Sequence, residues 1–327
     1  MTRGNGKLAC AACITWTLVL LPHPMSCQST VDESYPEPPA IASLQLAPEA
    51  ADRLQKAVSA RDYITAEKVL LPEIDRDPHS PRGARLLAFT GTVYFRNQDY
   101  INAAIAWKKS EAIAPLDPSI RFLLAMDYIR MAHPDWARPL LESLAAQNEK
   151  EALYPYWLGR LDYDGHLYNN AIRHFQHAIE LDPNMARAYD NLGLSYYYQN
   201  QNDQAVTNYE KAIELGSKSA NPSPWPYLNL AITQQFLNRD ADAEKNLREA
   251  IRLDPGFAKA HFQLGTVLED LQRLEEALAE LREAARLDPA YPEPHMAMAR
   301  VLRKLGQEAA AREEAATYVR LRPHSTP

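Results

Sequence analysis

Four side chains that could bind a metal ion lie close together in the sequence. His174 and His177 are three residues apart, and Asp164 and His166 come shortly before them. Imidazole and carboxylate groups are ordinary zinc ligands, and a spacing of three places two side chains on the same face of a helix. The same residues also fit the variable, solvent-facing positions of an amphipathic helix. We therefore expect neither a metal site nor a cofactor.

Catalytic motifs are absent from the sequence. It contains no G-x-x-x-x-G-K, G-x-S-x-G or H-E-x-x-H stretch. Cys10, Cys13 and Cys27 are its three cysteines, so the chain beyond residue 27 has no thiol nucleophile and no disulfide framework. With 46% hydrophobic and 24% charged residues, the composition is that of a globular protein. We expect that this chain is not an enzyme.

The first 27 residues have the pattern of an export signal. Arg3 and Lys7 precede an uncharged, mostly apolar run over residues 8–21, and Pro22 ends it. The run is short for a membrane-spanning helix, which needs about 20 apolar residues, so we favour a cleaved signal over an uncleaved anchor. The sequence before Cys27 resembles a bacterial lipoprotein signal in its small Ser26 but not in Pro24. Lipidation at Cys27, with membrane anchoring, is the alternative.

A segment rich in proline, serine and acidic residues follows, over residues 28–46, and we expect it to be an extended tether. The full chain carries a formal charge of −7, and removal of residues 1–27 takes away only positive charges. An acidic chain is a poor candidate for sequence-independent binding to phosphate backbones. We expect no nucleic-acid partner, and a location outside the cytoplasm, such as the periplasm.

A 34-residue period runs through the rest of the chain. One series consists of glycine or alanine, and a second consists of alanine alone. Their members are Gly91, Ala125, Gly159, Gly193, Ala231, Gly265 and Ala299, and Ala103, Ala137, Ala171, Ala205, Ala243, Ala277 and Ala311. Every step is 34 residues except one of 38 in each series, so a single four-residue insertion explains both exceptions. Such a period indicates stacked structural repeats.

Each unit is predicted to contain two antiparallel helices. Ala171, Phe175 and Ala178 show the spacing of one helical face, and Pro183 then closes the unit. Turn residues such as Asp164 and Gly165 lie midway. The small residues would let the two helices approach closely, and a large residue four after the alanine would fill the space against the neighbouring unit.

These residues resemble the tetratricopeptide repeat family, most clearly through Leu192, Gly193, Tyr196, Ala205 and Tyr209. The resemblance implies an all-α, right-handed superhelical solenoid of antiparallel helix pairs. We expect a degenerate repeat at 47–83, four repeats at 84–219, an insertion at 220–223 and three repeats at 224–325. Pro134 and Pro139 depart from the pattern, and we expect the helix that contains them to start late or to kink.

The resemblance also implies a concave groove, lined mainly by the first helix of each pair. Asn191, Asn229 and Gln263 occupy the same place in consecutive units, where amides could bond the backbone of an extended peptide, as in the asparagine ladder of some family members. The residues expected to face the groove are Arg187, Asn191, Tyr197, Tyr198, Trp225, Asn229, Lys259 and Gln263.

The sequence therefore favours a non-enzymatic, exported scaffold that binds a protein or peptide in this groove. Two alternatives remain open. The array could be the recognition subunit of a glycosylation or envelope-biogenesis system whose catalysis lies on another chain. It could also be a structural homo-oligomer joined through the last helix, where Tyr318, Val319 and Leu321 supply an apolar surface.

Overall fold

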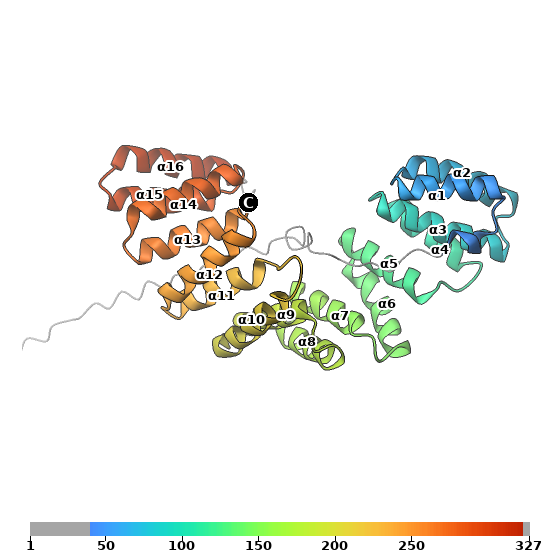
Figure 1. Cartoon of the computed structure of the whole chain (residues 1–327), viewed down its shortest axis with the longest axis horizontal. Coiled ribbons are helices and arrows are strands. Elements are labelled where there is room, and N and C mark those ends of the chain that lie inside the picture. The colour runs from blue at the N-terminus through green and yellow to red at the C-terminus, as the bar shows by residue number, and fades with distance from the viewer. Residues whose placement is uncertain (1–39, 323–327) are drawn as a thin grey trace, which may run out of the picture. The chain divides into compact units, whose positions relative to one another are not determined.

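The computed structural model describes residues 40–322, and this part of the chain is all-α (Figure 1). Sixteen α-helices and no strand occur in it. The first helices of the eight pairs are α1 (Pro48–Ser59), α3 (Pro81–Arg96), α5 (Pro118–Arg130), α7 (Leu153–Asp164), α9 (Ala186–Tyr198), α11 (Trp225–Phe236), α13 (Ala258–Asp270) and α15 (Glu293–Lys304). The second helices are α2 (Tyr63–Arg76), α4 (Tyr100–Glu111), α6 (Pro134–Gln147), α8 (Tyr168–Leu181), α10 (Asn202–Gly216), α12 (Asp240–Leu253), α14 (Leu274–Leu287) and α16 (Glu308–Leu321).

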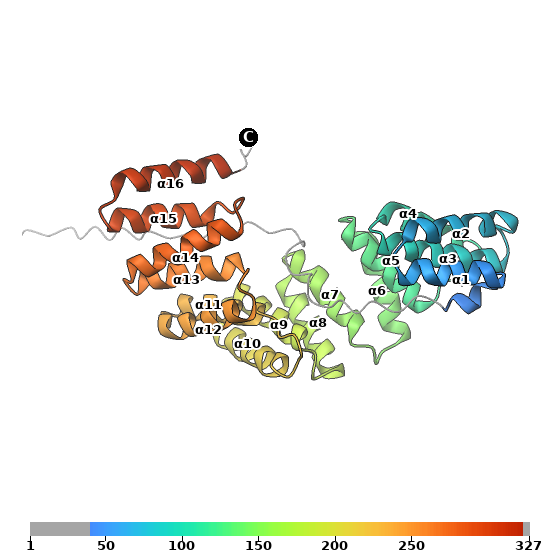
Figure 2. The same cartoon turned by 45° about the horizontal axis from the view of Figure 1, so that its top comes forward.

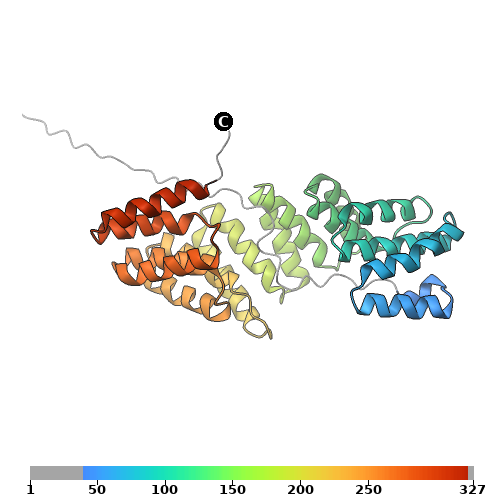
Figure 3. The same cartoon turned by 90° about the horizontal axis from the view of Figure 1, so that it is seen from above.

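The helices pack as a solenoid of pairs, which confirms the predicted fold class. The two helices of each pair contact each other, and each second helix contacts the first helix of the next pair. Figure 2 shows one such step, in which the pair α13–α14 is followed by the pair α15–α16, and Figure 3 shows the same succession from above. The signal, Cys27 and residues 28–39 of the tether lie outside the described residues.

The glycine series positions the large side chains within each pair. A Cβ atom on Gly91 would lie 2.5 Å from the ring of Trp107, and one on Gly159 would lie 2.8 Å from the ring of Phe175. The large residue therefore packs against the glycine of its own unit. The sequence prediction placed it against the neighbouring unit, which is wrong as the main contact, because the antiparallel partner helix is the nearer surface.

Every aromatic residue of this series faces a glycine, whereas leucine faces either glycine or alanine. Glycine faces Trp107, Phe175, Tyr209 and Leu281, whereas alanine stands at the same place in the units that carry Leu141, Leu247 and Ala315. Every alanine of the second series is fully buried. An aromatic ring leaves no room for a methyl group on the facing helix, as expected for an interior packed at crystal density.

The turn inside each pair has one repeated conformation. Counting from the start of each unit, the fifteenth residue has φ between +56° and +74° in all eight pairs. These residues are Arg61, Gln98, Ala132, His166, Asn200, Asn238, Gln272 and Gly306. Only Gly306 is free of the steric cost of the left-handed region, so packing of the two helices imposes this conformation on the other seven.

Two sequence expectations about local structure, a late start of α6 and an extended tether up to residue 46, are wrong. Helix α6 begins at Pro134, the seventeenth place of its unit, where every other second helix also begins, and the alternative expectation of a kink in α6 stays a prediction. Proline is tolerated there because the first amide of a helix has no helical acceptor. Residues 40–46 are not an extended tether, since Ile41–Leu44 form a 3₁₀ helix and Leu44 is 0% exposed. Leu44 belongs to the apolar cluster around α1–α3, whose burial outweighs the cost of ordering this turn.

None of the helices between residues 40 and 322 is long and apolar enough to cross a membrane. The insertion at 220–223 lengthens the connection between α10 and α11, but α11 still contacts both α9 and α10. First helices of consecutive units also contact each other from α7 through α15. These four contacts place α7, α9, α11, α13 and α15 along one side of the array, the side from which the candidate groove residues come.

Candidate functional site

The three amides predicted to line the groove, Asn191, Asn229 and Gln263, differ in their hydrogen-bond partners. Asn191 is 4% exposed, and its Nδ2 donates to the backbone oxygen of Arg187 at 2.8 Å and lies 3.4 Å from the hydroxyl of Tyr156 on α7. Its Oδ1 is buried and accepts no hydrogen bond among the described residues. An unpaired buried carbonyl is costly, by about 1–3 kcal/mol, so this atom has unused capacity to accept an N–H group.

The other two amides already have partners on neighbouring first helices. Asn229 Nδ2 donates to Asp190 Oδ1 at 2.9 Å, which joins α11 to α9. Gln263 Nε2 donates to Gln235 Oε1, which joins α13 to α11. In the structure as described, these side chains bridge the repeats, so a peptide must displace or extend these bonds to use them.

Two arginines interact with Tyr156, one with its ring and one with its hydroxyl. The guanidinium carbon of Arg187 is 4.7 Å from the ring centroid, a cation–π contact, and the hydroxyl of Tyr156 is one of the groups that stabilise charged Arg160. The Nε of Arg160 is buried without a hydrogen-bond partner in the described part of the chain. Arg160 therefore offers an unused donor close to the unused acceptor of Asn191.

Asp190 is the buried acid of this region. Burial raises the pKa of its carboxyl to about 6, and the hydrogen bond from Asn229 and the charge of Arg160 limit the rise. Neither Tyr156, Arg160 nor Asp190 was predicted from the sequence. Reading the ninth place of the unit at 152–185, one of the places expected to face the groove in later units, would have found Arg160.

The remaining predicted residues lie at opposite ends of the first helices. Trp225 and Lys259 are second in their units, and the Lys259 ammonium lies 5.2 Å from the Trp225 ring, which also contacts Phe257 at 4.8 Å. Tyr197 and Tyr198 lie at the other end of α9, where Tyr198 stacks on Tyr168 at 4.9 Å with an interplanar angle of 5°. A helix rises 1.5 Å per residue, so the two ends are about 16 Å apart. The structure thus divides the predicted residues between an aromatic–cation end, a polar middle and a tyrosine end.

Two of the three histidines considered as metal ligands, His166 and His174, have other partners. His174 Nδ1 lies 2.7 Å from Oδ2 of Asp162, a carboxylate that is 1% exposed and also accepts a bond from Arg138. His166 lies 2.9 Å from the hydroxyl of Tyr168, in the left-handed turn. Residues 40–322 contain no group of three or more His, Cys, Asp or Glu side chains arranged to hold a metal ion.

Comparison with known proteins gives matches to one repeat family. Two profiles described as tetratricopeptide repeat match residues 184–255 and 228–292, and a third, described as TPR repeat, matches residues 159–199. Among curated proteins, the chain is similar to protein STIP1 homolog of Dictyostelium discoideum, at 34% identity over 105 residues, and to DnaJ homolog subfamily C member 7 homolog of the same organism, at 23% over 156 residues. These stretches cover 32% and 44% of this chain but only 17% and 29% of the two relatives.

Solved structures agree on the fold. A tetratricopeptide repeat protein from Parabacteroides merdae has a TM-score of 0.62 at 16% identity, covering 85% of this chain and 99% of that one. PilW, described as a type IV pilus biogenesis factor, has a TM-score of 0.56 at 19% identity, covering 61% of this chain and 90% of that one. Since the helix pairs, their 34-residue period and three family profiles agree, residues 159–292 of this chain are tetratricopeptide repeats.

Proposed function

We propose that this protein is a non-enzymatic, exported scaffold that binds a protein or an extended peptide segment along the first helices α7, α9, α11 and α13. The observation that carries the proposal is the pair of unused polar groups between α7 and α9. Asn191 Oδ1 lacks a donor and Arg160 Nε lacks an acceptor among the described residues. A peptide group supplies both, an N–H for the amide oxygen and a C=O for the guanidinium.

Access to these groups requires a side chain to move. Asn191 Oδ1 is enclosed, and Arg187 is held next to it by a ring contact rather than by an ion pair. A cation–π contact at a partly exposed site contributes only about 0.5–1 kcal/mol, so a bound segment can displace the guanidinium at small cost. The bonds from Asn229 to Asp190 and from Gln263 to Gln235 keep neighbouring first helices in register beneath the segment.

Capture experiments with the full chain test the groove. We expect the double variant Asn191→Ala/Asn229→Ala and the single variant Arg160→Gln to lose partners that wild type retains, while circular dichroism shows unchanged helix content. The matched control is Asn208→Ala on α10, whose side chain bonds only the Gln204 carbonyl of its own helix. An unchanged set of captured proteins for Arg160→Gln would contradict the groove assignment.

Export is proposed from the pattern of residues 1–27, which lie outside the described residues. We expect mass spectrometry of the protein from its native host to find a mature N-terminus near residue 28. If Cys27 is acylated, labelled palmitate will be incorporated and the variant Cys27→Ser will lose it. A chain that retains Met1 and remains in the cytoplasm would contradict export.

Self-association through the last helix is a separable part of the proposal. Val319 on α16 is 63% exposed, and Tyr318 beside it is only partly buried. We expect the variant Tyr318→Glu to lower the molar mass measured by light scattering if a dimer forms. A monomer for both proteins would exclude this interface.

A further inference from the structure

A continuous row of aromatic rings lies at the turn ends of α7, α8, α9 and α11. We name it the aromatic edge, and its members are Tyr163, Tyr168, Tyr197, Tyr198 and Phe236. Tyr198 stacks on Tyr168 and meets Tyr163 and Tyr197 edge-on at 5.8 and 5.6 Å, and Tyr197 meets Phe236 at 6.4 Å. The row therefore crosses three consecutive units.

Part of this row is open to solvent. Tyr198 is 38% exposed and Phe236 is 60% exposed. Leu167, next to Tyr168, is also exposed. Single exposed apolar residues are normal on a protein surface, but a contiguous group that spans several repeats is typical of a contact surface.

Carboxylates without ion-pair partners border the Phe236 end of the edge. Asp240 begins α12 and Asp270 ends α13, and Asp270 accepts a hydrogen bond of 2.6 Å from Gln235, the residue before Phe236. Burial raises the pKa of the Asp240 carboxyl, and the nearby charge of Asp270 raises it further. Within residues 40–322, no Lys or Arg nitrogen lies within the 4.0 Å of an ion pair to either carboxylate.

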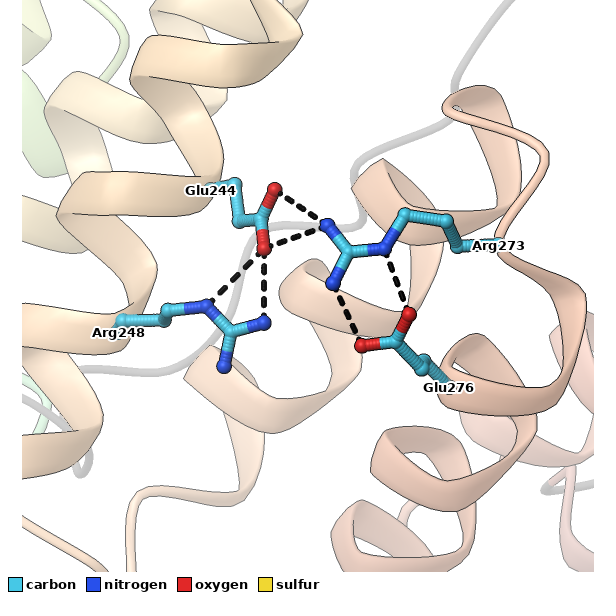
Figure 4. Close-up of polar contacts among 4 residues, drawn as sticks. All are labelled: Glu244, Arg248, Arg273 and Glu276. Carbon is cyan, nitrogen blue, oxygen red and sulfur yellow. Dashed lines mark hydrogen bonds and ion pairs between the residues drawn. The ribbon is translucent and has the colours of Figure 1, made fainter.

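Arg273, the arginine nearest to Asp270 in the sequence, forms ion pairs with two other carboxylates. Arg273 donates through Nη1 to both oxygens of Glu244 at 2.8 Å, and through Nε and Nη2 to Glu276 at 2.7 and 2.5 Å (Figure 4). Arg248 completes this group by donating to Glu244 from the same helix. A guanidinium held between two carboxylates does not also pair with Asp240 or Asp270. The charge of Arg300 acts on Asp270, but Arg300 forms its ion pair with Glu269, so the two acids at the aromatic edge keep no ion-pair partner within residues 40–322.

We propose that the aromatic edge binds arginine side chains of a basic segment in the protein partner. The inference rests on the proposed function and adds the chemistry of the partner. A guanidinium stacks on a tyrosine face and donates to carboxylates at its rim, and both groups are present at this edge. The chain already contains the first contact, in Arg187 over Tyr156 at 4.7 Å. The formal charge of −7 also attracts a basic segment over long range.

Three labelled peptides test the proposal by fluorescence anisotropy with the full chain. Each is a fluorescein-labelled decapeptide of glycine and serine in which every third residue is arginine, glutamine or glutamate. We expect the arginine peptide to bind most tightly at low salt and to weaken as salt is added, because the carboxylates are exposed to screening. A glutamate peptide that binds best would overturn the proposal and would favour an acidic partner at Arg160 and Arg187.

Matched variants locate the binding site. We expect Phe236→Ala, and the double variant Asp240→Asn/Asp270→Asn, each to weaken the arginine peptide about tenfold, as loss of about 1.4 kcal/mol implies. The controls are Glu308→Gln, which changes the acid at the same place of another unit as Asp240, and Val319→Ala, which truncates another exposed apolar residue. Equal losses in the controls would show a general charge effect and refute the site.

The two proposals fail in different ways. If the groove binds peptides without a basic preference, the three peptides will bind alike, and only Asn191→Ala/Asn229→Ala will release them. If the edge acts without the groove, the arginine peptide will bind and that double variant will not affect it. Absence of saturable binding of the arginine peptide up to about 1 mM at low salt would refute the aromatic edge as a basic-segment site.

Discussion

The Cβ position of Gly193 lies 2.6 Å from Cε1 of Tyr209, so no methyl group fits between α9 and α10. We expect Gly193→Ala to lower the free energy of unfolding by about 1–3 kcal/mol, because the ring of Tyr209 is fully buried and cannot move aside. Urea denaturation followed by circular dichroism measures the change. Gly216→Ala is the control, since nothing lies within 4 Å of its Cβ position, and a similar loss there would contradict the explanation.

From the left-handed turn residues we predict that two substitutions change the free energy of unfolding in opposite directions. Ala132 has φ +60°, and Gly306 has φ +74° at the same place of another unit. We expect Ala132→Gly to raise the free energy of unfolding by about 1 kcal/mol and Gly306→Ala to lower it by a similar amount, because only glycine adopts this region without strain. Thermal melting of the two variants checks both signs. Changes of the same sign would show that the turn conformation is not responsible.

Asp127 predicts a fall in stability as the pH rises. It is fully buried on α5 without a hydrogen bond to either carboxylate oxygen among the described residues, and burial, with a smaller effect of Asp99, raises its pKa to about 8. The folded chain keeps this proton up to about pH 8, whereas the unfolded chain loses it near the ordinary value of 3.8. The folded state therefore binds more protons, and stability falls between about pH 4 and pH 8.

The variant Asp127→Val tests this effect. Three other units carry valine at the place that corresponds to Asp127, namely Val93, Val267 and Val301. We expect the variant to gain about 1–3 kcal/mol at pH 8, with a smaller gain at pH 5. Denaturant midpoints measured at both pH values decide the matter. A gain that is independent of pH would show that packing, and not the carboxyl charge, explains it.

For Glu269 on α13 we expect the opposite dependence of stability on pH. It is almost fully buried, and Arg300 Nη2 and Lys304 Nζ lie 2.6 and 2.8 Å from its carboxylate. Burial opposes ionisation, but these two cations on α15 hold the pKa of Glu269 below its ordinary value of 4.5. Its contribution is therefore present above about pH 4.5 and is lost as the pH falls.

We expect Glu269→Gln to lower the free energy of unfolding by about 1–3 kcal/mol at pH 7 and to match wild type more closely in acid. The exposed Glu275 supplies the control variant Glu275→Gln, which should leave the denaturant midpoint unchanged. A loss in Glu269→Gln that stays constant down to pH 3 would argue against the ion pairs.

The repeats were predictable from the sequence because their signal is carried by packing. Ala205 and Gly193 recur at fixed spacing since only small residues let two helices meet, and the partner ring at Tyr209 follows from the same constraint. The turn residue was not predictable, because types as different as Arg61, Ala132 and His166 adopt one backbone conformation. There the helices on either side decide the conformation, and side-chain type leaves no pattern.

The candidate site was predictable only in part. The places of Asn191 and Asn229 could be found from the period, but their partners depend on which residue the adjacent helix presents. Asp190 accepts from Asn229, whereas no group within the described residues donates to Asn191 Oδ1. That difference arises between two units, and a pattern within one unit does not contain it.

The restriction of contacts to neighbouring pairs determines how this molecule comes apart. Apart from the 3₁₀ helix Ile41–Leu44, which reaches α3, the helices between residues 40 and 322 make their main contacts with elements one or two steps away along the chain. Opening of one pair therefore breaks bonds to two neighbours and leaves distant pairs intact. Amide hydrogen exchange should then be graded, with terminal pairs such as α15–α16 fraying before the central pairs. A binding surface carried by α7 to α13 is protected by its place in the middle of the array.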